Sequence, residues 1–135
     1  MNLFSVKSEA KLAHVHPSLV KVARAVLPMQ DCTVIYGART PEEQQKLVDE
    51  GLSKTLNSKH LIMNDGYCRA IDIAPYPIDW DNTKRFYYFA GLFLAKADSL
   101  HISIRWGGNW DMDEDLDDQT FMDLVHFELK ENGHV

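Results

Sequence analysis

The sequence has few cysteines, no long apolar run and no cluster of positive charge, and each absence excludes a class of protein. Its two cysteines, Cys32 and Cys68, match no zinc motif, and in a chain made in the cytoplasm we expect two buried thiols rather than a disulfide. No apolar run approaches the length that spans a membrane, and the first residues lack the basic and apolar regions of a signal peptide. The net charge of −6 disfavours nucleic acid as a partner, because phosphate binding needs clustered Lys and Arg. We therefore expect synthesis in the cytoplasm, no membrane insertion and no nucleic-acid binding.

The remaining composition is typical of one globular domain. Apolar residues make up 45% and charged residues 25% of the 135 positions, which is ordinary for soluble proteins. This length suffices for one core but not for two, so we expect a single domain over residues 1–135. We also expect a monomer.

Helical and strand patterns alternate along the chain and predict a mixed α and β fold. Helices are indicated by capping residues, by proline at first helical positions and by apolar residues at helical spacing, and strands by short β-branched and aromatic runs. One helix is expected to begin at Ser8, and three more are expected over residues 17–27, Thr40–Gly51 and Asn82–Leu100. The expected strands are Cys32–Tyr36, Ala70–Ala74, His101–Trp106 and Val125–Leu129. The helix over residues 82–100 is apolar nearly all round, so we expect it to pack on several sides.

Arg39 lies where a predicted strand gives way to a predicted helix. Thr40 and Glu43 match a capping box, and Gln44 falls in the first turn of that helix. Polar side chains at such a junction lie off the edge of the sheet, where functional sites are often built. A solvated loop residue is the alternative interpretation of Arg39.

A lone carboxylate, Asp72, lies in the middle of the apolar run Ala70–Ala74. A carboxylate in a buried strand is costly unless it is paired or binds a metal, which makes Asp72 the most informative acid in the chain. A loop rich in Ser, Thr and Asn precedes it and carries Ser58 and His60.

His126 and Glu128 are separated by one residue in the last predicted strand. Side chains at i and i+2 of a strand share a face, so these two point the same way while Val125, Phe127 and Leu129 face the core.

Two imidazoles and one carboxylate can hold a divalent metal and leave a fourth position open, as in catalytic zinc sites. If the face of His126 carries such a metal, Asp123 can accept the proton of a water molecule whose pKa the zinc lowers. A cation such as Arg39 would stabilise the oxyanion that develops. These parts predict a metallohydrolase without a side-chain nucleophile.

Several motifs carry a family resemblance: Ser58-Lys-His60 followed by Ala70-Ile-Asp72, the segment from Gly37 to Gln45, Asp123-x-x-His126, and the segments Trp106–Asp111 and His126–Leu129. They resemble the VanY-type D-alanyl-D-alanine carboxypeptidase family and, within it, phage endolysins that are L-alanyl-D-glutamate peptidases. The likeness extends from about Val15 to Leu129.

This resemblance implies a small α+β fold, an antiparallel sheet flanked by helices, as in hedgehog-type and lysostaphin-like peptidases. It also implies roles for seven residues: zinc ligands His60, Asp72 and His126, general base Asp123, Arg39 on the carbonyl oxygen, and Ser58 and Gln44 holding the peptide.

The spacing of the first motif departs from that of the family. The family usually has seven residues from His to Asp, whereas His60 and Asp72 are twelve apart, as if residues 63–67 were inserted. Cys68 stands where the motif has glycine, and Asp65 becomes a rival ligand. We prefer Asp72 because the residues around it preserve the end of the motif, and because Asp65 lies in a turn that would keep it solvated.

The resemblance implies a zinc metallopeptidase that cuts the L-alanyl-D-glutamate bond of peptidoglycan stem peptides as a phage or prophage endolysin. Without a signal peptide, it would stay in the host cytoplasm until a pore released it to the cell wall. The alternatives are a D-alanyl-D-alanine carboxypeptidase or dipeptidase, and a non-catalytic zinc-containing wall-binding module. The facial triad of Fe(II) oxygenases is disfavoured, because its acid usually lies two residues after the first His.

An acidic run precedes Asp123 and is a candidate calcium site. Alternating acids are how an EF-hand loop begins, but Leu116 and Met122 stand where that loop has glycine and glutamate. A solvated acidic face is the alternative. The run contains Asp111, Asp113, Asp115 and Asp117, with Asp118 beside them.

Overall fold

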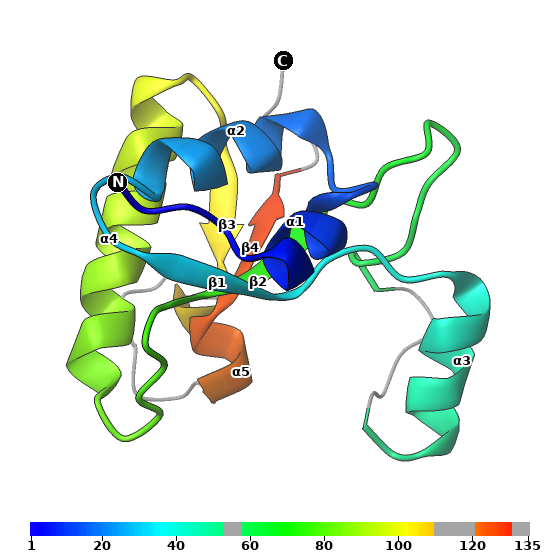
Figure 1. The fold of residues 1–135 in the computed structure, drawn as a ribbon. Coiled ribbons are helices and arrows are strands. Elements are labelled where there is room, and N and C mark those ends of the chain that lie inside the picture. Colours follow the sequence, from blue (N-terminus) through cyan, green and yellow to red (C-terminus); the bar gives the residue numbers. More distant parts are fainter. Residues whose placement is uncertain (53–57, 110–120, 131–135) are drawn as a thin grey trace.

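The computed structural model describes residues 1–52, 58–109 and 121–130. The elements are, in order, α1 (Val6–Leu12), α2 (Pro17–Val26), β1 (Cys32–Tyr36), α3 (Pro41–Asp49), β2 (Ala70–Pro75), α4 (Thr83–Ser99), β3 (Ile104–Trp106), the 3-10 turn η1 (Gly107–Asn109), α5 (Phe121–Leu124) and β4 (His126–Leu129). The strands form an antiparallel four-stranded sheet in the order β1-β2-β4-β3. Figure 1 shows α4 along one side of the molecule and α3 at the opposite side, beyond the end of β1. The expected small α+β fold with helices flanking an antiparallel sheet is confirmed.

The two faces of the sheet differ in chemistry. Val125, Phe127 and Leu129 are buried in the core, as the alternation predicted. The core face packs against α2 and α4, which also contact each other. The other face carries Asp72 and His126, which are direct partners across β2 and β4. The sheet therefore holds its polar residues on the face opposite the core.

Two helix starts show how local sequence determines the elements. Thr40 accepts a hydrogen bond from the Glu43 amide and the Glu43 carboxylate accepts one from the Thr40 amide, so the predicted capping box begins α3. The start predicted at Ser8 is wrong, because Ser5 is the cap of α1. Ser8 is buried inside α1, where its hydroxyl accepts a hydrogen bond from the backbone amide of Val34 at 3.0 Å. Ser8 thus covers the outer edge of β1.

Two further expectations need correction. The strand expected over His101–Trp106 is only Ile104–Trp106, because the preceding residues complete the C-terminus of α4. His101 has a φ of 61°, and the amide of Ile102 donates to the carbonyl of Ala97 at 2.9 Å. Helix α4 buries one face rather than several, since Tyr88 on another face is 64% exposed.

Both cysteines are free and buried, and burial raises the pKa of the Cys32 thiol to about 12. Among the described residues, no helix is long and apolar enough to cross a membrane.

Candidate metal centre

Three side chains from distant segments converge on the polar face of the sheet: His60 from the loop before β2, Asp72 from the centre of β2, and His126 from the start of β4. The Asp72 Oδ1 atom lies 3.2 Å from His60 Nε2 and 2.9 Å from His126 Nδ1. Each residue offers one ligand atom, and these atoms all lie within 4.8 Å of one another. His60 and Asp72 are buried and His126 is half-buried.

Backbone pairing places these residues. The antiparallel register of β2 and β4 puts Asp72 directly opposite His126. The loop that carries His60 runs beside the connection between β1 and α3, where the Arg39 amide donates to the His60 carbonyl at 2.7 Å and the Ile62 amide donates to the Arg39 carbonyl at 3.1 Å. The Ser58 hydroxyl accepts a hydrogen bond from the His60 amide at 3.1 Å. These contacts hold His60 over the sheet.

The ring nitrogens that point away from the centre are also hydrogen-bonded. His60 Nδ1 donates to the carbonyl oxygen of Gly37 at 2.8 Å, and His126 Nε2 lies 2.9 Å from Glu128 Oε1. The other carboxylate oxygen of Glu128 pairs with Arg105 Nη2 at 3.1 Å. Metal-binding histidines typically donate their second ring N–H to a carbonyl or a carboxylate, which fixes the orientation of the ring. The donor set and its supporting hydrogen bonds therefore fit a divalent metal ion.

The same contacts determine the charges of the metal-free centre. Burial would raise the pKa of Asp72, but hydrogen bonds from His126 and His60 hold it well below the usual range. Burial would lower the pKa of His126, but hydrogen bonds to Asp72 and Glu128 and the charges of these carboxylates raise it to about 9. Burial would raise the pKa of Glu128, but the hydrogen bond from His126 and the charge of its ring outweigh the effect of burial, so the pKa of Glu128 is lowered. The metal-free centre thus combines ionised carboxylates with a protonated His126.

The rival acid, Asp65, lies away from this centre. It is in the exposed turn formed by residues 63–67, where its Oδ2 atom pairs with Arg69 Nη2 at 2.6 Å. That hydrogen bond is the main cause that lowers the pKa of Asp65. The structure therefore brings Asp72, and not Asp65, together with the two histidines.

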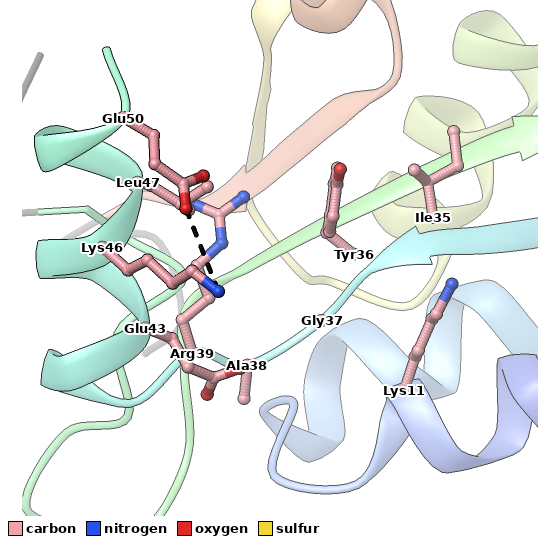
Figure 2. Close-up of a pocket in the computed structure, with 10 residues that line it drawn as sticks. All are labelled: Lys11, Ile35, Tyr36, Gly37, Ala38, Arg39, Glu43, Lys46, Leu47 and Glu50. Carbon is pink, nitrogen blue, oxygen red and sulfur yellow. Dashed lines mark ion pairs between the residues drawn. The ribbon is translucent and has the colours of Figure 1, made fainter. Parts of the chain in front are cut away.

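Arg39 and Gln44 lie together beside the end of β1. Arg39 Nη1 donates to Gln44 Oε1 at 3.1 Å, and the guanidinium carbon lies 5.1 Å from the centroid of the Tyr36 ring. Figure 2 shows Arg39 between α3 and Tyr36. The side chain of Gln44 is buried. These contacts hold the guanidinium group in one place.

Asp123 lies in α5, three residues before His126, and is half-buried. Two contacts attach α5 to the end of β3: Trp106 Nε1 donates to the Leu124 carbonyl at 2.8 Å, and Gly107 packs against the backbone of Asp123, where a Cβ atom would collide with the Asp123 carbonyl oxygen. The acidic run at residues 111–118 lies outside the described residues, and its calcium site stays a prediction.

Sequence reasoning missed three supporting groups: the Gly37 carbonyl, the Glu128 carboxylate and the Arg105 guanidinium. Strand alternation placed Glu128 on the face of His126 but did not reveal their hydrogen bond. Arg105 reaches Glu128 because the two are partners across β3 and β4. No local signal in the sequence identifies that partnership.

Comparisons with known proteins find a matching family, a similar sequence and a similar structure. Residues 1–130 match the family model described as phage L-alanyl-D-glutamate peptidase. The chain is 33% identical over 124 residues to the L-alanyl-D-glutamate peptidase of Escherichia phage T5, covering 86% of this chain and 87% of that protein. The crystal structure of the L-Ala D-Glu endopeptidase ChiX of Serratia marcescens is similar with a TM-score of 0.73 and 28% identity, covering 96% of this chain and 91% of that one.

Proposed function

The chain belongs to the phage L-alanyl-D-glutamate peptidase family, and from this we propose that it is a zinc peptidase acting on peptidoglycan stem peptides in host lysis. The bond that it cuts is the L-alanyl-D-glutamate bond. The observation that carries this proposal is the convergence of His60, Asp72 and His126, with the outward nitrogen of each ring already hydrogen-bonded. The family resemblance drawn from the sequence motifs is confirmed.

Zinc suits this ligand set, because two imidazoles and one carboxylate occupy three of its four tetrahedral positions. When bound, zinc would polarise the peptide carbonyl and lower the pKa of a water molecule to about 7. His60, Asp72 and His126 would hold it. As ligands, Asp72 must be ionised, and His60 and His126 must be unprotonated at the nitrogen that faces the metal. Hydrogen bonds to the Gly37 carbonyl and to Glu128 keep the two rings in a fixed orientation.

We assign the proton transfers to Asp123. A carboxylate beside the attacking water can accept its proton and later deliver it to the leaving amine of D-glutamate. Asp123 lies on α5, directly before the strand that begins with His126, and α5 is attached to the core through Trp106 and Gly107. This attachment would keep the carboxylate at a constant distance from the substrate.

We assign stabilisation of the developing oxyanion to Arg39. Its guanidinium is held by the Gln44 amide oxygen and the Tyr36 ring, so little reorganisation is needed during the reaction. Gln44 then acts on the peptide through Arg39, and Ser58 acts through the backbone of His60. Direct contact of Gln44 or Ser58 with the peptide remains part of the proposal.

The natural substrate is then the peptidoglycan of the host cell wall. We propose that the protein acts as a single-domain monomer that is made in the host cytoplasm and reaches the wall through a pore formed by another protein.

Mass spectrometry of digested peptidoglycan tests this function. The zinc-loaded protein is expected to release stem peptides with a new amino-terminal D-glutamate, and chelation should abolish the release until zinc is restored. Asp72→Ala should lose zinc and activity, whereas the matched control Asp65→Ala should keep both. Release of terminal D-alanine alone would indicate a carboxypeptidase instead, and binding without any cleavage would indicate a wall-binding module.

A further inference from the structure

A pocket of about 440 Å³ opens at the end of β1 (Figure 2). Its walls come from the last turn of α1, the end of β1 with the connection that follows, and one face of α3. Two of its residues touch the metal ligands or pair with them. Tyr36 is the partner of Asp72 across β1 and β2, and the Gly37 carbonyl accepts the hydrogen bond from His60. Since paired residues of neighbouring strands have Cα atoms about 5 Å apart, the pocket begins next to the proposed reaction site.

The carboxylates of this pocket already have partners. Glu43 accepts the hydrogen bond from the Thr40 amide at 2.9 Å in the capping box of α3. Glu50 lies 3.9 Å from the ammonium group of Lys46, the ion pair that Figure 2 marks with a dashed line. The charge of Lys46 is thus offset by Glu50, whereas Glu43 keeps its negative charge, so the lining carries one net positive charge.

Two cations remain, Lys11 and Arg39. Arg39 contacts the neutral amide of Gln44 and the ring of Tyr36. Within residues 1–52, 58–109 and 121–130, neither Lys11 nor Arg39 forms an ion pair with a carboxylate. In Figure 2 the two cations lie on opposite sides of Tyr36. The pocket thus offers an anionic ligand two positive charges around an aromatic ring.

The position of Lys11 is determined by close packing at Gly37. A Cβ atom at residue 37 would collide with the carbonyl oxygen of Lys11, so the last turn of α1 lies directly against the backbone that supports His60. This contact makes Lys11 part of the substrate side of the molecule, although it is sixty-one residues before Asp72 in the chain.

The proposed substrate carries an anion next to the bond that is cut. Glutamate has two carboxyl groups, and continuation of the stem peptide uses only one of them. The residue on the leaving side of the cut bond therefore keeps one free carboxylate unless it is amidated. We propose that this pocket binds the free carboxylate of the D-glutamate residue and that Lys11 makes the enzyme prefer the carboxylate over the carboxamide. This inference rests on the proposed function.

Two synthetic stem peptides test it, one with a free carboxylate on D-glutamate and one with the corresponding carboxamide. The measured quantity is the ratio of their kcat/KM values on each zinc-loaded protein. We expect the wild-type ratio to favour the carboxylate and Lys11→Met to lower this ratio about fivefold, mainly through KM, which is the size of one partly exposed charged contact. Lys11→Arg should restore most of the preference. The matched control is Lys7→Met, which removes an exposed lysine of α1 that does not line the pocket.

The outcomes separate this inference from the function on which it rests. Because both substrates are compared on the same protein sample, partial loss of folded enzyme cancels in the ratio. Cleavage of both peptides with an unchanged ratio in Lys11→Met would overturn the role of Lys11 and leave the peptidase function intact. Cleavage of neither peptide by the wild-type protein would refute the function itself.

Discussion

The protonation of His126 should make binding of the proposed zinc ion depend on pH. In the metal-free protein the ring lies between two carboxylates, with Nδ1 2.9 Å from Asp72 and Nε2 2.9 Å from Glu128, and its pKa is raised to about 9. Zinc needs the lone pair of Nδ1, so one proton must leave when the metal binds. Asp72 is already ionised and releases none. Zinc affinity should therefore fall about tenfold, or about 1.4 kcal/mol, when the pH is lowered from 8 to 7.

The assay is a zinc competition titration against a chelator of known affinity at several values between pH 7 and pH 8. Glu128→Gln supplies the matched variant, because its amide oxygen can still accept the hydrogen bond from His126 Nε2 while the charge is removed. Without that charge the pKa of His126 should fall towards its usual value, and the affinity should change less steeply with pH. A wild-type affinity that is independent of pH in this range would refute the protonated state of His126.

The same shift predicts how the metal-free protein responds to alkali. The pKa of His126 is higher in the folded state than the value of about 6.5 expected after unfolding, so this group stabilises the fold fully below about pH 6.5. That stability is lost as the pH rises through about 9, and it is on the order of 3 kcal/mol. Thermal unfolding of the metal-free protein should show a falling midpoint over this range, and Glu128→Gln should show a smaller fall.

Two further substitutions test the proposed mechanism and the packing around it. Asp123→Asn should keep zinc but lower turnover by about 10² to 10⁴, as for a lost general base, and near-normal turnover measured on stem peptides would remove Asp123 from the mechanism. Gly37→Ala should destabilise the fold by about 1–3 kcal/mol and weaken zinc binding, because its Cβ atom collides with the Lys11 carbonyl and displaces the support of His60. Calorimetry and zinc titration measure both effects. Gly91→Ala is the control, since a Cβ atom there meets nothing within 4 Å, and equal behaviour of the two variants would contradict the packing argument.

Local features of the fold could be read from the sequence because their physical causes lie within a few residues. The capping box of Thr40 and Glu43 begins α3 as predicted, and the bounds of the strand Cys32–Tyr36 agree with those expected. The alternation in β4 correctly assigned Phe127 to the core face. The local patterns by themselves predicted only a mixed α and β fold, and the resemblance of the motifs to a known family implied the antiparallel α+β fold.

Elements whose ends depend on distant contacts were predicted less well. Ser8 had the chemistry of a helix cap, but in the fold its hydroxyl serves the edge of β1 while Ser5 caps α1. The strand expected from His101 begins later, because the amide of Ile102 is used by the end of α4. In each case the sequence offered a hydrogen-bonding group, and tertiary packing selected its partner.

In the candidate site, too, some features follow from the local sequence and others depend on distant contacts. The sequence by itself determined which residue types are available for a metal. It favoured Asp72 over Asp65 because the residues around Asp72 preserve the end of the family motif and Asp65 lies in a turn. Only the tertiary structure decided that His60, Asp72 and His126 meet, that Glu128 and Arg105 support His126, and that Lys11 lies beside them. The physical reason is that these contacts depend on strand register and on close backbone packing, which join residues far apart in the chain and leave no local pattern.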